Sequence, residues 1–226
     1  MYEAVHAFPE GESTAARFAR TAADHGFEGI AVRARGGDSE GVAGSDAPAL
    51  AQVAEATGID VVDAVEIVAD SPASASGAVG NHRPDHTILA VRGGTDALNR
   101  FAVEQERVDV LTRPFAAGGD VNHVLANAAR EHGVRIEFDV GPVLRSVAGA
   151  RVRALQDLRK LRELVADADA PFVVSANPRS HLQVRAPREL VALGEAIGFD
   201  AATVEDGQRE WGRLAARTRE RLSPEF

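Results

Sequence analysis

The sequence predicts an α/β fold of the (β/α)8 barrel type, the TIM barrel, and three observations support it. Eight short apolar runs alternate with segments whose apolar residues recur every three or four positions. Glycines follow four of these segments, at Gly26, Gly58, Gly133 and Gly198, where a helix end in left-handed backbone favours glycine. A chain of 226 residues that is 45% hydrophobic is long enough to enclose one core. Eight repeated units favour a closed parallel barrel, although an open parallel sheet remains the alternative.

The expected elements follow one another in strict alternation. The expected strands are Tyr2–His6, Gly29–Arg33, Val61–Val68, Thr87–Arg92, Val108–Arg113, Arg135–Val140, Phe172–Ala176 and Ala201–Val204. The expected helices are Ser13–His25, Ala47–Thr57, Thr95–Glu106, Val121–His132, Arg151–Ala168, Ala186–Ile197 and Asp206–Leu222. No repeat or change in composition marks a boundary, so residues 1–226 are predicted to form a single domain. The stretch 70–84 is rich in Ala, Ser and Gly, and we expect it to be a mobile surface loop.

Composition excludes several classes of protein. The chain has no cysteine, which excludes disulfides, thiolate metal sites and a cysteine nucleophile. No apolar run approaches the roughly 20 residues that span a bilayer, and the N-terminus lacks the features of a signal peptide, so we expect a soluble, cytoplasmic protein. Because the net charge is −9, bulk attraction of nucleic acid is not expected. Lys160 is the only lysine, a composition typical of a halophilic archaeon with GC-rich DNA.

Arginines lie where a barrel concentrates function, at the carboxyl ends of the strands. Three expected strands end in Arg33, Arg92 and Arg113, and later loops add Arg145, Arg179 and Arg185. A guanidinium group can donate to two phosphate oxygens at once, and it stays charged at every accessible pH. Arginines gathered on one rim could therefore form a site for an anion or for the RNA backbone. The alternative is that each arginine pairs with an acidic neighbour.

The segment 151–163 is a second concentration of positive charge. Arg153 and Lys160 are seven residues apart and project from the same side of the expected helix, where they could contact one stretch of RNA backbone. The alternative is a solvated helix face. Trp211, the only tryptophan, is expected to be a packing residue of the last helix.

The histidines and carboxylates of the sequence raise the alternative of metal-dependent hydrolysis. His6, His123, Glu137 and Asp139 could serve a free-standing metal-dependent phosphoesterase. However, the first strand has no His-x-His pair, and ligands are not clustered at the strand ends, so we expect neither a metal site nor catalytic residues in the protein. A small-molecule barrel enzyme with a phosphate-binding rim is a third possibility.

The central part of the sequence resembles a known family. The segments Asp85–Gly94 (DHTILAVRGG), Leu98–Ala102 and Val108–Pro114 (VDVLTRP) are similar to the central block of the ribonuclease P protein component 3 family, whose eukaryotic relatives are 30-kDa subunits. Ile136–Phe138, Pro142–Arg145, the basic segment from Arg151, Pro171–Asn177 and Leu182–Pro187 follow in the order of the family. The resemblance covers about Tyr2 to Gly207.

The resemblance implies a barrel related to polymerase and histidinol phosphatase type phosphoesterases but without their metal ligands. It implies a subunit of the ribonucleoprotein endoribonuclease ribonuclease P, with no catalysis by the protein alone. The catalytic RNA, using magnesium, would remove the 5′ leader of precursor tRNA. The protein and another protein subunit would bind and stabilise that RNA. The expected RNA-binding residues are Arg92, Arg113, Asn177, Arg179 and Arg185, with Arg153 and Lys160 as a second contact. This chain departs from the family in its single lysine and its negative charge. The stretch 70–84 is not recognisably similar to the family, so the resemblance implies nothing about it.

Overall fold

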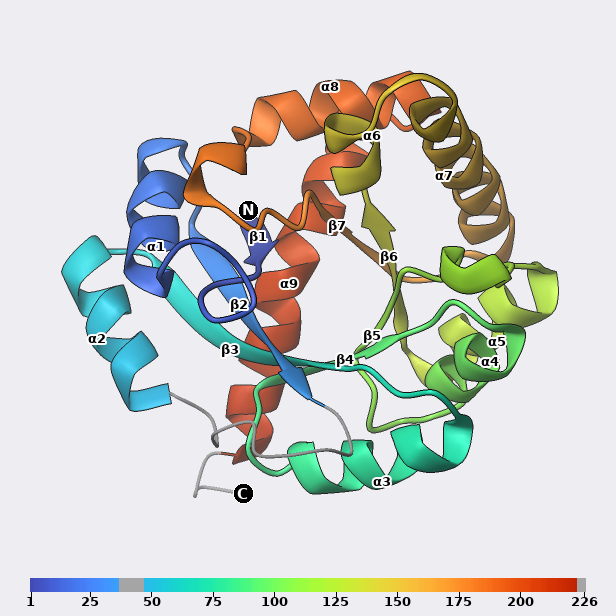
Figure 1. Ribbon diagram of the computed structural model, residues 1–226, viewed down its shortest axis with the longest axis horizontal. Coiled ribbons are helices and arrows are strands. Elements are labelled where there is room, and N and C mark those ends of the chain that lie inside the picture. The colour runs from blue at the N-terminus through green and yellow to red at the C-terminus, as the bar shows by residue number, and fades with distance from the viewer. Residues whose placement is uncertain (37–46, 223–226) are drawn as a thin grey trace.

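Seven parallel strands form a nearly closed barrel, seen end-on in Figure 1. The computed structural model describes residues 1–36 and 47–222. The strands are β1 (Tyr2–Val5), β2 (Gly29–Gly36), β3 (Asp60–Ile67), β4 (Ile88–Arg92), β5 (Val110–Thr112), β6 (Arg135–Asp139) and β7 (Phe172–Ser175). Each strand pairs in parallel with the next in the sequence. Among the described residues no ladder joins β1 to β7, but the amide of His6, just after β1, donates to the carbonyl of Pro178 at 3.0 Å.

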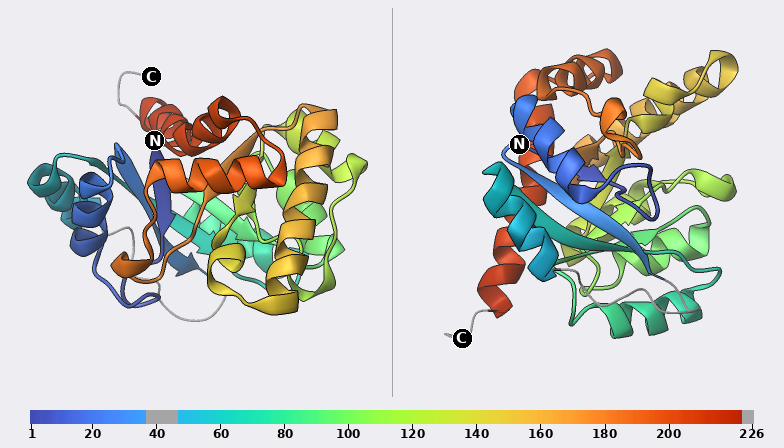
Figure 2. Two further views of the ribbon diagram at one scale, coloured as in Figure 1. Left: turned by 90° about the horizontal axis from the view of Figure 1, so that it is seen from above. Right: turned by 60° about the vertical axis from the view of Figure 1, so that its left-hand side comes forward.

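Helices surround the strands (Figures 1 and 2). They are α1 (Ala15–Asp24), α2 (Ala47–Thr57), α3 (Pro72–His82), α4 (Asp96–Val103), α5 (His123–His132), α6 (Gly141–Arg145), α7 (Ala148–Ala168), α8 (Pro187–Ile197) and α9 (Ala201–Leu222), with short 3-10 turns η1 (Ala116–Gly118) and η2 (His181–Gln183). The four glycines expected at helix ends all have positive φ, between 66° and 105°. None of the described helices has the length and apolar character needed to cross a membrane.

The eighth expected strand, Ala201–Val204, was wrong, because these residues begin the 22-residue helix α9. Asp200 caps this helix, with its carboxylate accepting from the amide of Thr203 at 2.9 Å. Val204 is fully buried against Gly194 of α8. A side chain at position 194 would clash with Val204. The alanines and the cap therefore favour helix, and the apolar run that suggested a strand is the buried face of α9.

Helix α9 closes the barrel at the amino ends of the strands instead of adding a strand. It contacts β1, β4 and β7, and in Figure 1 it crosses behind the barrel. Trp211, Leu214 and Ala215 are completely buried against inward-facing residues of the strands. Gly212 allows the close approach, because a Cβ atom there would lie 2.4 Å from the ring of Tyr2. The expectation that Trp211 is a packing residue is confirmed.

The stretch 70–84 is not a loop, which corrects a second expectation. Residues 72–82 form α3, whose cap Ser71 accepts from the amide of Ser74 at 3.3 Å. Ala75, Ala78 and Val79 are buried at helical spacing. Small residues hid this pattern in the sequence, because alanine and glycine give a weak apolar periodicity even where one face is buried.

Replacing Gly77 by Ala should stabilise the protein by about 0.5–1 kcal/mol, because glycine is a poor helix former and space is open around its α-carbon. Chemical denaturation measures the difference. The matched control is Gly58→Ala, where φ is +74° and the same change should destabilise. A loss of stability in Gly77→Ala would contradict the helix.

Candidate functional site

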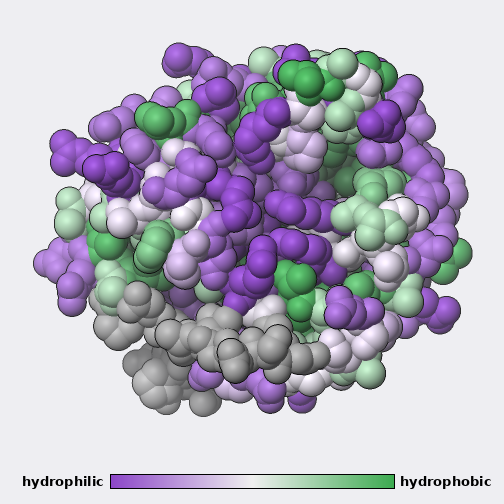
Figure 3. Space-filling model, viewed as in Figure 1, coloured by the Kyte–Doolittle hydropathy of each residue, from purple (hydrophilic) through white to green (hydrophobic). Residues whose placement is uncertain are grey.

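The interior of the barrel is divided into an apolar layer and a polar layer. Inward-facing side chains alternate along each strand, so that on β3 Val62 and Ala64 precede Glu66, and on β4 Ile88 and Ala90 precede Arg92. The apolar residues meet α9 at the amino end, and the polar residues gather at the carboxyl end. Figure 3 shows this carboxyl end as a hollow with a hydrophilic centre. We call this opening the mouth.

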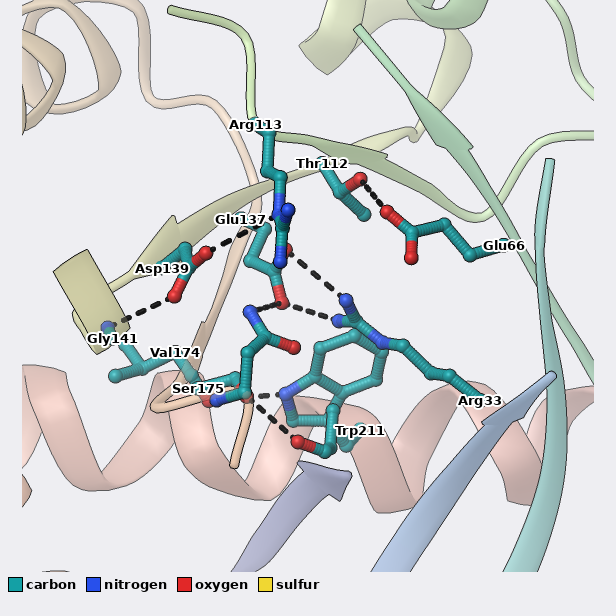
Figure 4. A network of polar contacts seen from close by, with 12 residues as sticks. Arg33, Glu66, Thr112, Arg113, Glu137, Asp139, Gly141, Val174, Ser175 and Trp211 are labelled. Carbon is teal, nitrogen blue, oxygen red and sulfur yellow. Dashed lines mark hydrogen bonds and ion pairs between the residues drawn. The ribbon is translucent and has the colours of Figure 1, made fainter. Parts of the chain in front are cut away.

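An ion pair between Arg33 of β2 and Glu137 of β6 crosses the mouth (Figure 4). Both side chains are almost completely buried, and the guanidinium meets the carboxylate with both terminal nitrogens. Burial opposes the charge on Arg33, yet the attraction of Glu137 and Glu66 outweighs it and raises the pKa of Arg33. The guanidinium carbon lies 4.8 Å from the centre of the Trp211 ring, so a cation–π contact supports the pair from below.

A second group joins Glu66 of β3 to β4 and β5. Arg92 donates to both carboxylate oxygens of Glu66, at 3.0 and 3.2 Å, and the hydroxyl of Thr112 donates to it at 3.0 Å. Burial alone would raise the pKa of Glu66, but the positive charge of Arg33 and the bonded Arg92 lower it to about 2. Glu66 is thus a fixed negative charge that holds Arg92.

His6, just after β1, is buried beside this group. Its Nε2 lies 3.9 Å from a carboxylate oxygen of Glu66 and has no hydrogen-bond partner among the described residues. Burial, followed by the positive charge of Arg33, lowers the pKa of His6 to about 3, while Glu66 opposes the shift. His6 is therefore neutral at physiological pH.

Arg113 and Asp139 face each other at the edge of the mouth. Their closest nitrogen and oxygen are 3.6 Å apart, and the other carboxylate oxygen of Asp139 accepts from the amide of Gly141 at 2.9 Å. Arg113 has left-handed backbone with φ of 49°, unusual for a residue other than glycine. Because such conformations cost about 1–3 kcal/mol and cluster at functional sites, the strain marks this edge as a candidate site.

Asn177, after β7, also has a φ of 49° but is completely buried. Its amide nitrogen donates to Glu137 at 3.1 Å, so the side chain expected to contact RNA is directed into the barrel. Next to it, the hydroxyl of Ser175 donates to Glu3, a fully buried carboxyl that the sequence analysis did not single out. Burial raises the pKa of Glu3 to about 7 even though Ser175 and the amide of Ala176 bind it.

The remaining expected cations lie closer to solvent. Arg179 is exposed and donates to the carbonyl of Glu10, whereas Arg185 is half-buried and donates to the carbonyl of Val184 at 3.3 Å. On α7, Arg153 is exposed, and Lys160 forms an exposed ion pair with Asp120 at 2.6 Å. Exposed ion pairs contribute little and exchange readily, so Lys160 stays available for another anion.

The structure brings the strand-end arginines together, but it pairs the inner ones with carboxylates. Arg33 is closed off by Glu137, and Arg92, whose side chain is 21% exposed, is held by Glu66. Arg113 is 32% exposed and Arg145 is exposed at the rim, where its guanidinium donates to the carbonyl of Asn177 at 3.2 Å. Alternation from Ala31 would have predicted that Arg33 points inward, because residues two apart share a face. No pattern in the sequence predicts that Glu137, 104 residues away, is its partner.

The carboxylates of the mouth are already engaged by guanidinium groups. In the described ranges, no cluster of three or more His, Asp or Glu side chains is arranged to hold a metal ion. His123, one residue of the phosphoesterase alternative, is exposed at the start of α5. A divalent cation would have to displace Arg33 or Arg113 to reach Glu137 or Asp139, so this donor set does not fit a catalytic metal. The arrangement instead offers hydrogen-bond donors and positive charge to a ligand above the mouth.

The chain is similar to a family of defined function along nearly all its length. The family described as RNase P subunit p30 matches residues 2–222. Ribonuclease P protein component 3 of Halorubrum lacusprofundi is 60% identical, over 100% of this chain and 94% of that protein. The protein of the same name in Haloarcula marismortui is 57% identical, over 99% of this chain and 92% of that protein.

Solved structures confirm the barrel. A chain in the cryo-EM structure of archaeal ribonuclease P with mature tRNA has a TM-score of 0.82 at 22% identity, with 96% of this chain and 91% of that chain covered. Histidinol phosphate phosphatase from Lactococcus lactis has a TM-score of 0.58 at 10% identity, covering 88% of this chain and 94% of that chain. Both likenesses concern the fold.

Replacing Arg33 by Met should destabilise the protein by about 3–5 kcal/mol, because Glu137 would remain buried without its counter-charge. The double variant Arg33→Met, Glu137→Gln should recover at least about 1 kcal/mol of that loss, since the glutamine can still accept from Asn177. Urea unfolding of the two single variants and the double variant measures the coupling. Additive losses would show that the two side chains do not interact.

Replacing His6 by Gln should reduce the sensitivity of the fold to acid. The imidazole binds a proton near pH 6.5 when unfolded but only near pH 3 when folded, so the unfolded state gains protons first and stability falls as the pH drops through this window. The variant lacks this contribution, so its stability relative to the wild type should improve from pH 7 to pH 4. Unfolding at both values provides the measurement, and a constant difference would contradict the buried neutral histidine.

Proposed function

The chain belongs to the RNase P subunit p30 family, and from this we propose that it is a protein subunit of ribonuclease P. It binds and stabilises the catalytic RNA that removes the 5′ leader from precursor tRNA. The protein itself supplies no catalytic residue and no metal site. Its further partners are another ribonuclease P protein subunit and, through the complex, precursor tRNA. The hydrolysis uses magnesium bound by the RNA and takes place in the cytoplasm.

The observation that supports this proposal most strongly is the extent of the family match. It covers residues 2–222, and relatives that carry the name of the subunit are 57–60% identical over almost the entire chain. The chemistry of the mouth agrees with a supporting role. Glu66 and Glu137 both bind arginines, and each is almost fully buried. They are therefore poorly placed to coordinate a metal or to activate water.

The proposed RNA contact uses the cations that the structure leaves accessible. Arg179 and Arg153 are exposed, Arg113 and Arg185 are partly exposed, and Lys160 can exchange Asp120 for a phosphate. Arg92 contributes only if RNA competes with Glu66. Because the chain carries a net charge of −9, binding depends on direct contacts between these side chains and the RNA more than on attraction over a distance.

Reconstitution tests the function. The purified protein alone should cleave no precursor tRNA, whereas adding it with its partner subunit to the cognate RNA at limiting magnesium should raise the rate of 5′ leader removal. The partner with RNA but without this protein is the control. Equal rates with and without this protein would contradict the proposal, as would cleavage by the protein alone.

The salt dependence of RNA binding by the reconstituted complex distinguishes arginines that contact phosphates from arginines with a structural role. Arg179→Ala and Arg153→Ala should each weaken RNA binding and reduce the salt dependence by about 0.7–0.9 in the slope of log K against log salt, as expected for one lost phosphate contact. The matched control is Arg213→Ala on α9, where Arg213 pairs with Asp206 and Glu210. An unchanged slope in both variants would exclude these residues from the interface.

A further inference from the structure

A recess of about 420 Å³ opens beside the mouth, between the segment after β5, α6 and α7. This volume lies in the range of sites that hold a small organic ligand. In Figure 3 the surface next to the hydrophilic centre becomes hydrophobic on the side of α7. The recess thus has a polar side formed by the barrel and an apolar side formed by the helix.

The apolar side of the recess presents an aromatic ring, a proline ring and leucine side chains to a ligand. Phe115 and Pro114 come from the segment after β5, whereas Leu158 and Leu161 come from α7. Phe115 is only half-buried, although it packs against the hydrophobic core. An aromatic ring that faces an open recess provides a stacking surface for a planar ligand.

The polar side combines donors and acceptors. Arg113 and Arg145 supply guanidinium groups, and Asp139 and Asp157 supply carboxylates. The Nε of Arg113 is buried and has no hydrogen-bond partner within the described parts of the chain, although it lies 3.6 Å from Asp139. Arg113, which lines the recess, also has left-handed backbone. These donors are therefore held in place without being fully used.

The positive and negative side chains that line the recess cancel, which favours a neutral ligand over a phosphate. Glu137 also lines the recess, but Arg33 neutralises it. The two remaining guanidinium groups then face two carboxylates, so a phosphate would meet as much repulsion as attraction. A neutral planar molecule with both accepting and donating edges suits the apolar walls and the mixed polar side.

We propose that this recess binds one unstacked guanine of the ribonuclease P RNA. The guanidinium groups of Arg113 and Arg145 face the O6 and N7 acceptors of the base, a pairing that arginine makes with guanine. The carboxylates of Asp139 and Asp157 accept from its N1–H and N2–H groups, and Phe115 stacks on the ring. RNA-binding proteins commonly read single-stranded bases by such stacking and edge contacts. The other bases lack this combination. Adenine places an amino donor beside N7, cytosine has the adjacent acceptors O2 and N3 but no ring N–H beside its amino group, and uracil has no amino group.

This inference rests on the proposed function, and its test is arranged so that each can fail separately. Complexes are reconstituted from the RNA, the partner subunit and the protein and are treated with a 1,2-dicarbonyl reagent that modifies N1 and N2 of unpaired guanines. The wild-type protein should protect one unpaired guanine. Ala154→Trp fills the recess from α7 and should restore the reactivity of that guanine by about fivefold or more, as expected from the loss of base stacking.

The matched control is Val152→Trp on the same helix. Val152 is exposed and points to the opposite side from Ala154, because two residues correspond to about 200° of helix. The control should keep the guanine protected. If Ala154→Trp fails to fold, Asp157→Asn removes one acceptor from a partly exposed position and should give a smaller increase in the same reactivity.

Two results would overturn the inference while leaving the proposed function intact. In the first, the complex assembles and cleaves, but the variants and the wild type give the same guanine pattern. In the second, probing of adenines shows that an adenine is protected in place of a guanine. Failure of the complex to assemble with the wild-type protein would instead contradict the proposed function.

Discussion

The buried ion pair between Arg33 and Glu137 is the constraint on which the mouth of the barrel depends. It joins β2 to β6 across the interior, and the ring of Trp211 from α9 lies under the guanidinium. Two charges removed from water are tolerated only when they are paired with each other, so the positions of both strands and of α9 are fixed together. Asn177 extends the same network to β7 through its hydrogen bond to Glu137.

This constraint also decides what chemistry the barrel can perform. A carboxylate that already binds a guanidinium is a poor metal ligand and a poor general base, and the mouth engages Glu66 and Glu137 in this way. Polar groups at the carboxyl ends of barrel strands usually act on a substrate. Here the same position presents a rigid surface with donors at its rim, which suits the support of a folded RNA whose own groups carry out hydrolysis.

The mouth and its surroundings therefore divide into two zones. The inner zone pairs Arg33 and Arg92 with the buried carboxylates of Glu137 and Glu66, so it stabilises the barrel. The outer zone, with Arg113 and Arg145 beside the recess and Arg179 on the loop after β7, keeps donors within reach of a ligand. An acidic protein can bind RNA in this way, because contact at a few defined groups does not require a positive surface.

The sequence by itself determined the seven parallel strands, most of the helices between them, the glycines that end four of those helices, and the arginines that follow the strands. These features depend on local periodicity and backbone conformation, which neighbouring residues specify. Only the tertiary structure decided that Ala201–Val204 is helical, that residues 72–82 form α3, and that Glu137 captures Arg33. In each case contacts with other elements, such as the packing of Val204 on Gly194 or the pairing of Glu137 with Arg33, decide the outcome together with the local caps. The recess depends on three separate segments, so no local pattern could reveal it.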